Sequence, residues 1–139
     1  MLGCFAWPAQ AHAPADRYQI NDTTVLDKKT HLLWQRTVPP TRHVWRDAQS
    51  YCQGLNLDGH SGWRLPNIKE LQTLVDRRTV KPAIDVTAFP NSPWEKPDDW
   101  FWSATPGADG PDVAWVTSFA KGENGIGWVS YAYWVRCVH

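Results

Sequence analysis

The chain has 139 residues, a length that fits one domain large enough to bury a hydrophobic core of its own. Its fourteen basic and fourteen acidic residues cancel, so no general attraction to nucleic acid or to an anionic membrane is expected. No stretch of the sequence approaches the roughly 20 apolar residues that a membrane-spanning helix needs.

The first thirteen residues are mostly apolar or small and end in Ala11-His12-Ala13, a pattern typical of a signal-peptide cleavage site. A basic n-region is missing, so we expect residues 1–13 to be the truncated tail of a signal peptide, and a leader without meaning is the alternative. Residues 14–17 are then a linker, and residues 18–139 are the folded domain. Such a chain would be exported to the periplasm, to the cell surface or into the medium.

Short strands are predicted at the start of the domain. Residues 18–20 form one strand, and residues 25–27 and 32–34 form a hairpin around the polar turn at residues 28–30. Pro39 and Pro40 end this unit, because proline lacks the backbone N–H that a strand ladder uses.

The next segment has the apolar spacing of an amphipathic helix. Its apolar residues recur at helical intervals on one face and are Val44, Ala48, Tyr51, Cys52 and Leu55. Thr41 or His43 would begin this helix, and Thr41 is the better N-cap. Cys52 falls on the buried face of the predicted helix.

A second helix is predicted after the sequence Trp63-Arg64-Leu65-Pro66. Asn67 and Glu70 fit a capping box, and the inner stripe consists of Ile68, Leu71, Leu74 and Val75. Arg64 and Glu70 are either ligand contacts or, as we favour, a structural ion pair or cap. A local basic patch, which could contact sulfate or phosphate but is more simply a solvated helix face, consists of Lys69, Arg77, Arg78 and Lys81.

Residues 79–112 contain six of the eleven prolines and are predicted to form a long irregular loop with one short strand at residues 100–103. Aromatic rings stack on sugar C–H faces and carboxylates accept hydroxyl hydrogens, so the residues that suit sugar binding here are Trp94, Glu95, Asp98, Asp99, Trp100 and Trp102. Core packing is the alternative for Trp100 and Trp102, which share one strand face. These carboxylates could also hold calcium, but no Glu-Pro-Asn or Trp-Asn-Asp signature is present, so no metal or other cofactor is expected.

The end of the chain is rich in predicted strands. Residues 113–118 alternate between two faces, residues 121–125 form a hairpin loop, and residues 128–131 and 133–138 are the closing strands. Cys137 would point inward together with Tyr133 and Val135. Trp128, near the last hairpin, is a further surface candidate for ligand binding. Strands and helices are segregated along the chain, which indicates an α+β fold.

The sequence holds three cysteines and no complete enzyme motif. Cys4 falls in the expected signal peptide, which leaves Cys52 and Cys137 as an even pair. In an exported chain such a pair indicates a disulfide, and two buried free thiols are the alternative. Trp63 stands where a nucleophile elbow at residues 59–62 would need its second glycine, and no helix carries two histidines at zinc-protease spacing.

Five motifs occur in one order along the chain. They are Thr24-Val25-x-Asp27, Thr30-x-Leu32-x-Trp34-Gln35, Trp45-x-x-Ala48-x-x-Tyr51-Cys52, Gly62-Trp63-Arg64-Leu65-Pro66-x-x-x-Glu70-Leu71 and Val135-Arg136-Cys137-Val138. Over residues 18–139 the chain resembles the C-terminal domain of the Legionella collagen-like adhesin family. The resemblance implies a C-type-lectin-like fold, distantly akin to the formylglycine-generating-enzyme group, in which two helices flank a small, mostly antiparallel twisted sheet with a long irregular loop. It also implies a disulfide between the first helix and the last strand, which agrees with Cys52 and Cys137.

The resemblance and the residues together predict a non-catalytic, adhesin-like module of the bacterial cell envelope or surface that binds a glycan or a surface protein. An enzyme of the formylglycine-generating-enzyme-like group is one alternative, although the predicted disulfide leaves no spare reactive cysteine in the domain. A structural subunit of an envelope assembly is the other alternative.

Overall fold

A computed structural model describes residues 16–139 of the chain. The predicted signal peptide at residues 1–13 and Cys4 lie outside the described residues, as does the first half of the predicted linker. The description therefore begins with a short turn at Asp16 and Arg17, directly before the first strand.

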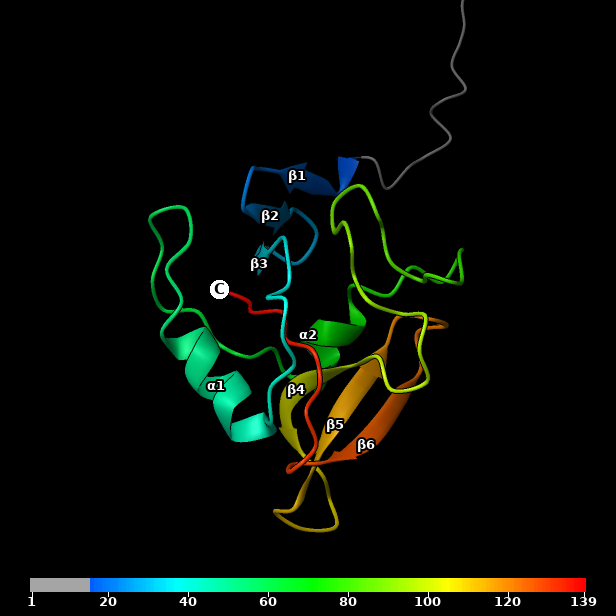
Figure 1. The fold of residues 1–139 in the computed structure, drawn as a ribbon. Helices are drawn as coiled ribbons and strands as arrows, with labels where there is room; N and C mark the ends of the chain where they lie inside the picture. Colours follow the sequence, from blue (N-terminus) through cyan, green and yellow to red (C-terminus); the bar gives the residue numbers. More distant parts are fainter. Residues whose placement is uncertain (1–15) are drawn as a thin grey trace, which may run out of the picture.

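The N-terminal strands form one antiparallel sheet, as the sequence predicts. Its strands β1 (Tyr18–Ile20), β2 (Thr24–Asp27) and β3 (Leu32–Gln35) lie in the order β1-β2-β3. In the turn that joins β2 to β3, the carboxylate of Asp27 accepts a hydrogen bond from the backbone N–H of Lys29 (3.0 Å). This sheet lies at one end of the molecule (Figure 1).

Two short helices follow. Helix α1 (Trp45–Gln53) buries Ala48 and Cys52, as predicted, but its N-cap is Val44, which makes no side-chain cap. The predicted cap at Thr41 is wrong because the backbone of His43 pairs with Tyr133 (2.8 and 2.9 Å), which keeps the chain extended until Val44. Helix α2 (Ile68–Gln72) has the predicted capping box but ends before Leu74 and Val75.

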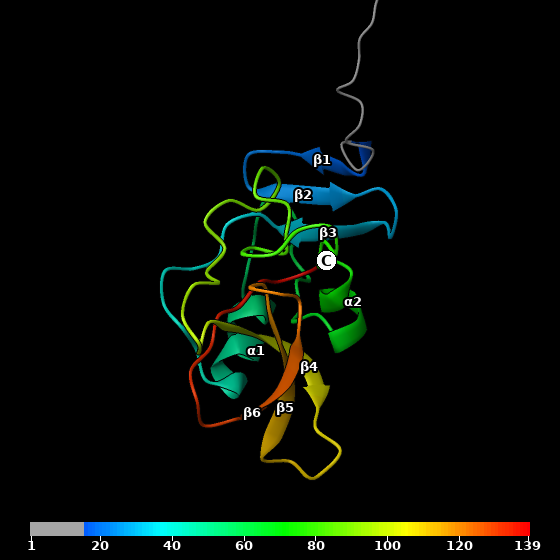
Figure 2. The ribbon, with the colours of Figure 1, turned by 90° about the vertical axis from the view of Figure 1, so that its right-hand side faces the viewer.

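The C-terminal half contains a second antiparallel sheet. Strands β4 (Trp100–Pro106), β5 (Val113–Ser118) and β6 (Asn124–Trp128) lie in the order β4-β5-β6. β5 is the predicted alternating strand, whereas β6 begins within the segment predicted to be a hairpin loop. Figures 1 and 2 show the two sheets at opposite ends of the molecule, with the C-terminus between them.

Residues 133–139 connect the two sheets. Backbone hydrogen bonds join His139 to Leu33 of β3 (2.8 and 3.1 Å) and join Trp134 to Trp100 of β4 (2.9 Å). The segment changes its partner every few residues, so it makes isolated bridges and no continuous strand. The predicted closing strands at residues 128–131 and 133–138 are therefore wrong.

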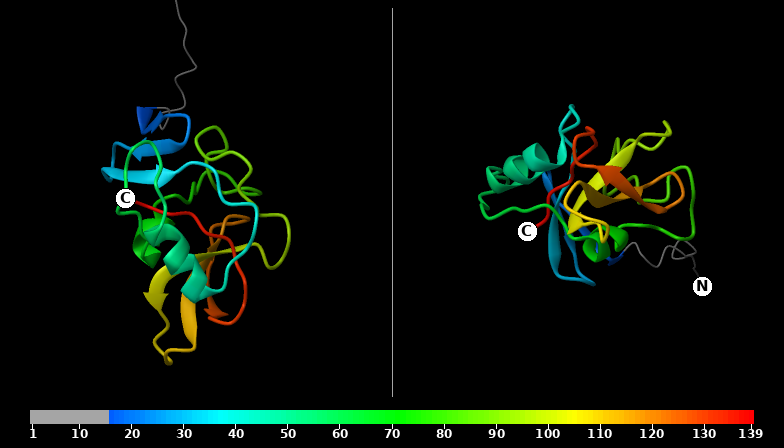
Figure 3. Two further views of the ribbon diagram at one scale, coloured as in Figure 1. Left: turned by 60° about the vertical axis from the view of Figure 1, so that its left-hand side comes forward. Right: turned by 90° about the horizontal axis from the view of Figure 1, so that it is seen from below.

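The predicted layout, in which two helices flank one small twisted sheet, is also wrong. Residues 16–139 form two separate three-stranded antiparallel sheets, and the helices in this range have only nine and five residues, so this part of the chain is richer in β-structure than predicted. The layout could not be predicted from local sequence patterns, because contacts between distant residues decide which strands pair in one sheet. The long loop at residues 79–99 and helix α1 lie on different sides of the molecule (Figure 3).

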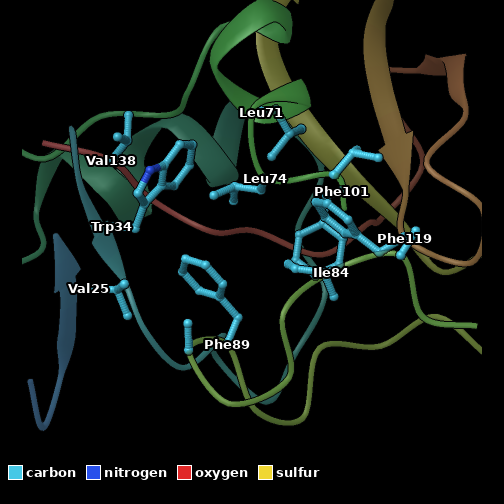
Figure 4. Close-up of a cluster of buried hydrophobic side chains, with 12 residues drawn as sticks. Val25, Trp34, Leu71, Leu74, Ile84, Phe89, Phe101, Phe119 and Val138 are labelled. Atoms are coloured by element: carbon cyan, nitrogen blue, oxygen red, sulfur yellow. The ribbon is translucent and has the colours of Figure 1, made fainter. Parts of the chain in front are cut away.

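Strand β4 separates two hydrophobic cores, because successive strand residues point to opposite faces. The first core (Figure 4) consists of Val25, Trp34, Leu71, Leu74, Val75, Ala83, Ile84, Ala88, Phe89, Phe101, Phe119 and Val138. The second core consists of Ala48, Cys52, Trp63, Leu65, Trp102, Ala114, Val116, Tyr133, Val135 and Cys137. The predicted disulfide between Cys52 and Cys137 is present and lies in the second core.

Candidate functional site

The long loop forms a cleft of about 630 Å³, which we call the loop cleft. Most of its lining comes from residues 82–99, and two lining residues come from distant parts of the chain. The lining consists of Arg42, Pro82, Val86, Pro90, Asn91, Ser92, Pro93, Trp94, Glu95, Lys96, Asp99 and Trp134. The cleft thus joins aromatic, charged and small polar side chains on one surface.

Asp99 fixes one wall of the loop cleft. Its buried carboxylate accepts hydrogen bonds from Nη2 of Arg42 (2.8 Å), from the indole Nε1 of Trp134 (2.9 Å) and from the backbone N–H of Lys96 (2.9 Å). Three donors occupy the carboxylate, so Asp99 holds the loop and has little capacity left for a ligand.

Arg42 is the partner of two carboxylates in this wall. Its guanidinium donates to Asp99 and also to the exposed Asp98 (2.8 Å), and it lies 5.1 Å from the ring centre of Trp134. The hydrogen bond from Arg42 lowers the pKa of Asp98, and the same bond raises the pKa of Arg42. The charges of this wall are therefore largely neutralised within the protein.

Arg136 lies beneath the loop and is fully buried. It donates to the hydroxyl of Ser92 (2.6 Å) and to the carbonyls of Gln35 (2.7 Å) and Arg36 (2.5 Å), and its guanidinium lies 4.8 Å from the ring centre of Phe89. Burial lowers the pKa of Arg136 to about 9, so the side chain is still charged at neutral pH. This buried cation ties the floor of the loop cleft to the end of β3.

Trp94, Glu95 and Lys96 are side chains of the cleft that a ligand can reach. Trp94 is half-buried and packs against the first core, while Glu95 and Lys96 are exposed. Among the described residues, the side chains of Glu95 and Lys96 form no ion pair. An aromatic face next to one acceptor and one donor can stack on an apolar ligand surface and hydrogen bond to its polar groups.

The structure divides the predicted ligand-binding residues between different places. Trp94, Glu95 and Asp99 meet in the loop cleft, and Asp98 lies at its rim on Arg42. Trp128 is exposed on β6 and does not line the cleft.

Trp100 and Trp102 point from β4 toward the second core. Trp102 is fully buried, and its indole donates to the carbonyl of His43 (2.7 Å). Trp100 is half-buried and lies against Gly125 of β6, where no side chain blocks the ring. Trp102 is a core residue and not a ligand contact, and packing also explains Trp100.

The Trp63-Arg64-Leu65-Pro66 motif is part of the scaffold. Trp63 and Leu65 are buried in the second core, and the buried Pro66 accepts a backbone hydrogen bond from Ala104 (2.7 Å). Arg64 points the other way and donates two hydrogen bonds of 2.7 Å to Glu70. The Arg64 hydrogen bond lowers the pKa of Glu70 against the opposing effect of burial.

Several residues that build the loop cleft were not predicted. Arg42 reaches Asp99 across 57 positions, and Arg136 reaches Ser92 across 44 positions, so no local pattern could pair them. The remaining lining residues missed by the sequence analysis include Lys96 and Trp134. Trp134 carried one indirect signal, because it directly precedes the Val135-Arg136-Cys137-Val138 motif.

Residues 16–139 hold neither a cluster of metal ligands nor a helix that could span a membrane. Within that range, no three histidine, cysteine, aspartate or glutamate side chains gather in a way that could hold a metal ion. No helix in the same range has the length and apolar character needed to cross a membrane.

Comparison with known proteins adds one finding. The family model of the Lcl C-terminal domain matches residues 23–139. The match includes β2 and β3 of the first sheet, the whole second sheet, both helices and the whole loop cleft, and it begins after β1. No curated protein matches the chain.

Proposed function

Because the chain belongs to the Lcl C-terminal domain family, as its motifs predicted, we propose that it is a non-catalytic ligand-binding module of the bacterial cell envelope or surface. The ligand that the loop cleft suits best is a glycan. One observation carries this proposal: the half-buried ring of Trp94 lies beside the exposed Glu95 and Lys96 in a cleft. A sugar presents an apolar C–H face and a ring of hydroxyls, which this combination complements.

The rigidity of the cleft supports binding. Asp99 holds the loop through three donors, and Arg136 holds Ser92 from below. The loop is therefore already ordered in the folded protein, so it loses less conformational entropy when a ligand binds.

The same hydrogen bonds argue against Asp99, Arg42 and Ser92 as catalytic groups. The carboxylate of Asp99 already accepts three hydrogen bonds, one of them from Arg42. The hydroxyl of Ser92 accepts a hydrogen bond from Arg136 and donates one to the carbonyl of Phe89 (3.0 Å). A nucleophile or general base needs a free lone pair in reach of a substrate. We also propose that binding needs no cofactor, because calcium at Asp98 and Asp99 would have to displace the guanidinium of Arg42 from both.

Location outside the cytoplasm is the second part of the proposal. The Cys52–Cys137 disulfide supports it, since disulfides persist in oxidising compartments such as the periplasm and the cell surface. Trp128 and Tyr131, each 54% exposed, favour a second candidate function, a structural contact with another envelope protein.

A glycan array tests the proposal with the oxidised protein and matched variants. We expect Trp94→Ala to weaken the binding of any glycan found by about tenfold or more, which corresponds to about 1.4 kcal/mol, and Glu95→Gln to weaken it less. Trp128→Ala, which removes an exposed tryptophan outside the loop cleft, should leave the affinity unchanged.

The outcomes separate the two candidates. If no glycan binds the folded protein, the proposal for the loop cleft fails. If binding survives Trp94→Ala and is lost in Trp128→Ala, the site is on β6 and not in the loop cleft. Circular dichroism of each variant establishes that a loss of binding is not a loss of fold.

A further inference from the structure

Strand β1 has an open edge. It is the outermost strand of its sheet. On the side that faces β2, the carbonyl of Arg17 accepts a hydrogen bond from the backbone N–H of Lys28, and the backbone N–H of Asn21 donates to the carbonyl of Thr24 (both 2.8 Å). Backbone groups alternate in direction along an antiparallel strand, so those of Tyr18 and Ile20 point away from the sheet. Within residues 16–139 no other group hydrogen bonds to them. The edge therefore offers a row of backbone donors and acceptors.

An apolar hollow of about 770 Å³ lies against this edge. Among the described residues, three of the six exposed large hydrophobic side chains line it: Ile20 (41% exposed), Val80 (62%) and Val86 (56%). Pro82 and Ile84 extend its apolar surface. Aliphatic side chains left in water around one hollow are typical of a binding surface.

A second hollow of about 560 Å³ continues the first, because both are lined by Tyr18, Asp76, Arg78 and Asp85. We call the two together the β1 groove. Its far end is basic, with five arginine and lysine side chains against three aspartates.

Not all of these basic side chains are neutralised within the fold. Arg17 pairs with Asp27 (2.7 Å) and Arg78 pairs with Asp76 (3.0 Å). In the described part of the chain, Lys28, Lys29 and Arg77 have no carboxylate partner within salt-bridge distance. One end of the β1 groove thus attracts negative charge, and the other end is apolar.

From this arrangement we infer that the β1 groove binds an extended, acidic segment of a partner polypeptide, which adds a strand to β1. Its backbone bonds to Tyr18 and Ile20, its apolar side chains at alternate positions enter the hollow beside Val80, and its carboxylates meet Lys28 and Lys29. This is strand addition at a sheet edge. Only a polypeptide supplies donors and acceptors at the spacing of a strand, and aliphatic walls give a sugar ring no aromatic face to stack on.

The β1 groove borders the loop cleft, because both are lined by Pro82 and Val86, but it differs from the cleft in its ligand class and does not include Trp94, Glu95 or Lys96. A protein anchored through the β1 groove would leave Trp94 and Glu95 open to a glycan. The groove would thus join this domain to a second envelope protein at a site next to the loop cleft.

A displayed library of random peptides of about seven residues, near the length of a typical strand, provides the probe. The library is selected on the oxidised full chain. We expect the enriched peptides to alternate apolar residues and to carry aspartate or glutamate. As synthetic peptides, they should slow amide hydrogen exchange at Tyr18 and Ile20 more than at Gln19, because the added strand bonds to the first two amides and the Gln19 amide already faces β2.

Matched variants sharpen the test. Ile20→Lys and Val80→Lys should each weaken the synthetic peptide by about tenfold, or about 1.4 kcal/mol, whereas Ile126→Lys, at a position 50% exposed on β6, should not change its affinity. Lys28→Glu with Lys29→Glu should weaken it as well, and Lys121→Glu, an exposed lysine elsewhere, should not. Thermal unfolding confirms that each variant is folded.

Several results would overturn the inference. They are the absence of enriched peptides, enrichment that is unaffected by Ile20→Lys, and binding without protection of the Tyr18 and Ile20 amides. Phosphatidylglycerol vesicles serve as a further arm. If they bind through Lys28 and Lys29 while the peptides do not, the groove recognises a lipid surface and the strand-addition proposal is wrong.

Discussion

The two hydrophobic cores lie on opposite faces of β4, and they are closed in different ways. The second core is closed by a covalent bond, the disulfide between Cys52 of α1 and Cys137. The first core is closed by the long loop, whose Phe89 packs into it and which a buried cation, Arg136, holds in place. Two adjacent residues of the C-terminal segment thus stabilise different cores: Arg136 the first and Cys137 the second.

This difference separates scaffold from site. The loop cleft lies on the side that is closed by hydrogen bonds, whereas the disulfide fastens α1 on the other side. The order of the cleft should therefore depend on Arg136 more than on the disulfide, while the stability of the whole domain should depend on the disulfide more than on Arg136. Two predictions test that ranking, and a third adds an exposed ion pair to it.

The largest loss of stability is expected when the disulfide is removed. The bond closes a sequence separation of 85 residues, and in the chain-entropy model a loop of this length contributes about 4.6 kcal/mol, an upper value. Cys52→Ala with Cys137→Ala should lower the free energy of unfolding by about that amount in urea denaturation.

The wild-type protein under reducing conditions is the natural control, because it loses the bond without any change in side-chain volume. It should match the double variant in stability. Amide exchange should become faster first in α1, while residues 86–96 keep their relative protection. Equal stability of oxidised and reduced protein would refute the role assigned to the disulfide.

A smaller effect on stability, but a larger one on the loop cleft, is expected for Arg136→Met. The change removes the donor from the carbonyls of Gln35 and Arg36 and from Ser92, and buried groups left without partners cost about 2–3 kcal/mol together. Removing a buried charge offsets part of that cost. Exchange should become faster at residues 86–96 and stay unchanged in α1.

Arg46→Met is the matched control, because Arg46 is exposed on α1. It should alter neither the free energy of unfolding nor the exchange of the loop. If Arg136→Met leaves residues 86–96 as protected as in the wild type, the loop is held by its own packing and the comparison between the two cores fails.

The comparison also shows which features of the fold could be read from the sequence. The hairpin of β2 and β3, the capping box at Asn67 and Glu70, and the buried face of α1 are local patterns, and the structure has all three. The disulfide could be predicted because Cys52 and Cys137 are the only cysteines of the domain. The number of sheets could not, because the segment that connects them makes only isolated bridges.

Arg136 shows why the candidate site was only partly predictable. The inward positions of Tyr133, Val135 and Cys137 indicated a strand with one buried face, which would leave Arg136 in water. The segment runs between the two cores and is buried on both faces, so Arg136 enters the first core as Val135 and Cys137 enter the second. A strand covered on both faces shows no simple polar alternation.

The smallest effect on the free energy of unfolding is expected at the exposed face of α2, where Arg64 and Glu70 form an ion pair. Arg64 is half-exposed, so its pair with Glu70 should contribute only about 1 kcal/mol or less after solvent screening. Glu70→Gln removes the charge and keeps a side chain that can complete the capping box. Because Arg64 lowers the pKa of Glu70 in the folded protein, the ion pair stabilises the fold above the ordinary glutamate pKa of 4.5, and this contribution is lost as the pH falls through the lowered value.

Urea denaturation should therefore show Glu70→Gln to be less stable than the wild type at neutral pH, with a gap in the free energy of unfolding that closes in acid. The control Glu123→Gln, at an exposed residue, should show no gap at either pH. A gap of equal size at both pH values would mean that Glu70 acts through packing and not through its charge. The exposed ion pair would then have no place in the order of stabilising interactions, in which the disulfide ranks first and the buried Arg136 second.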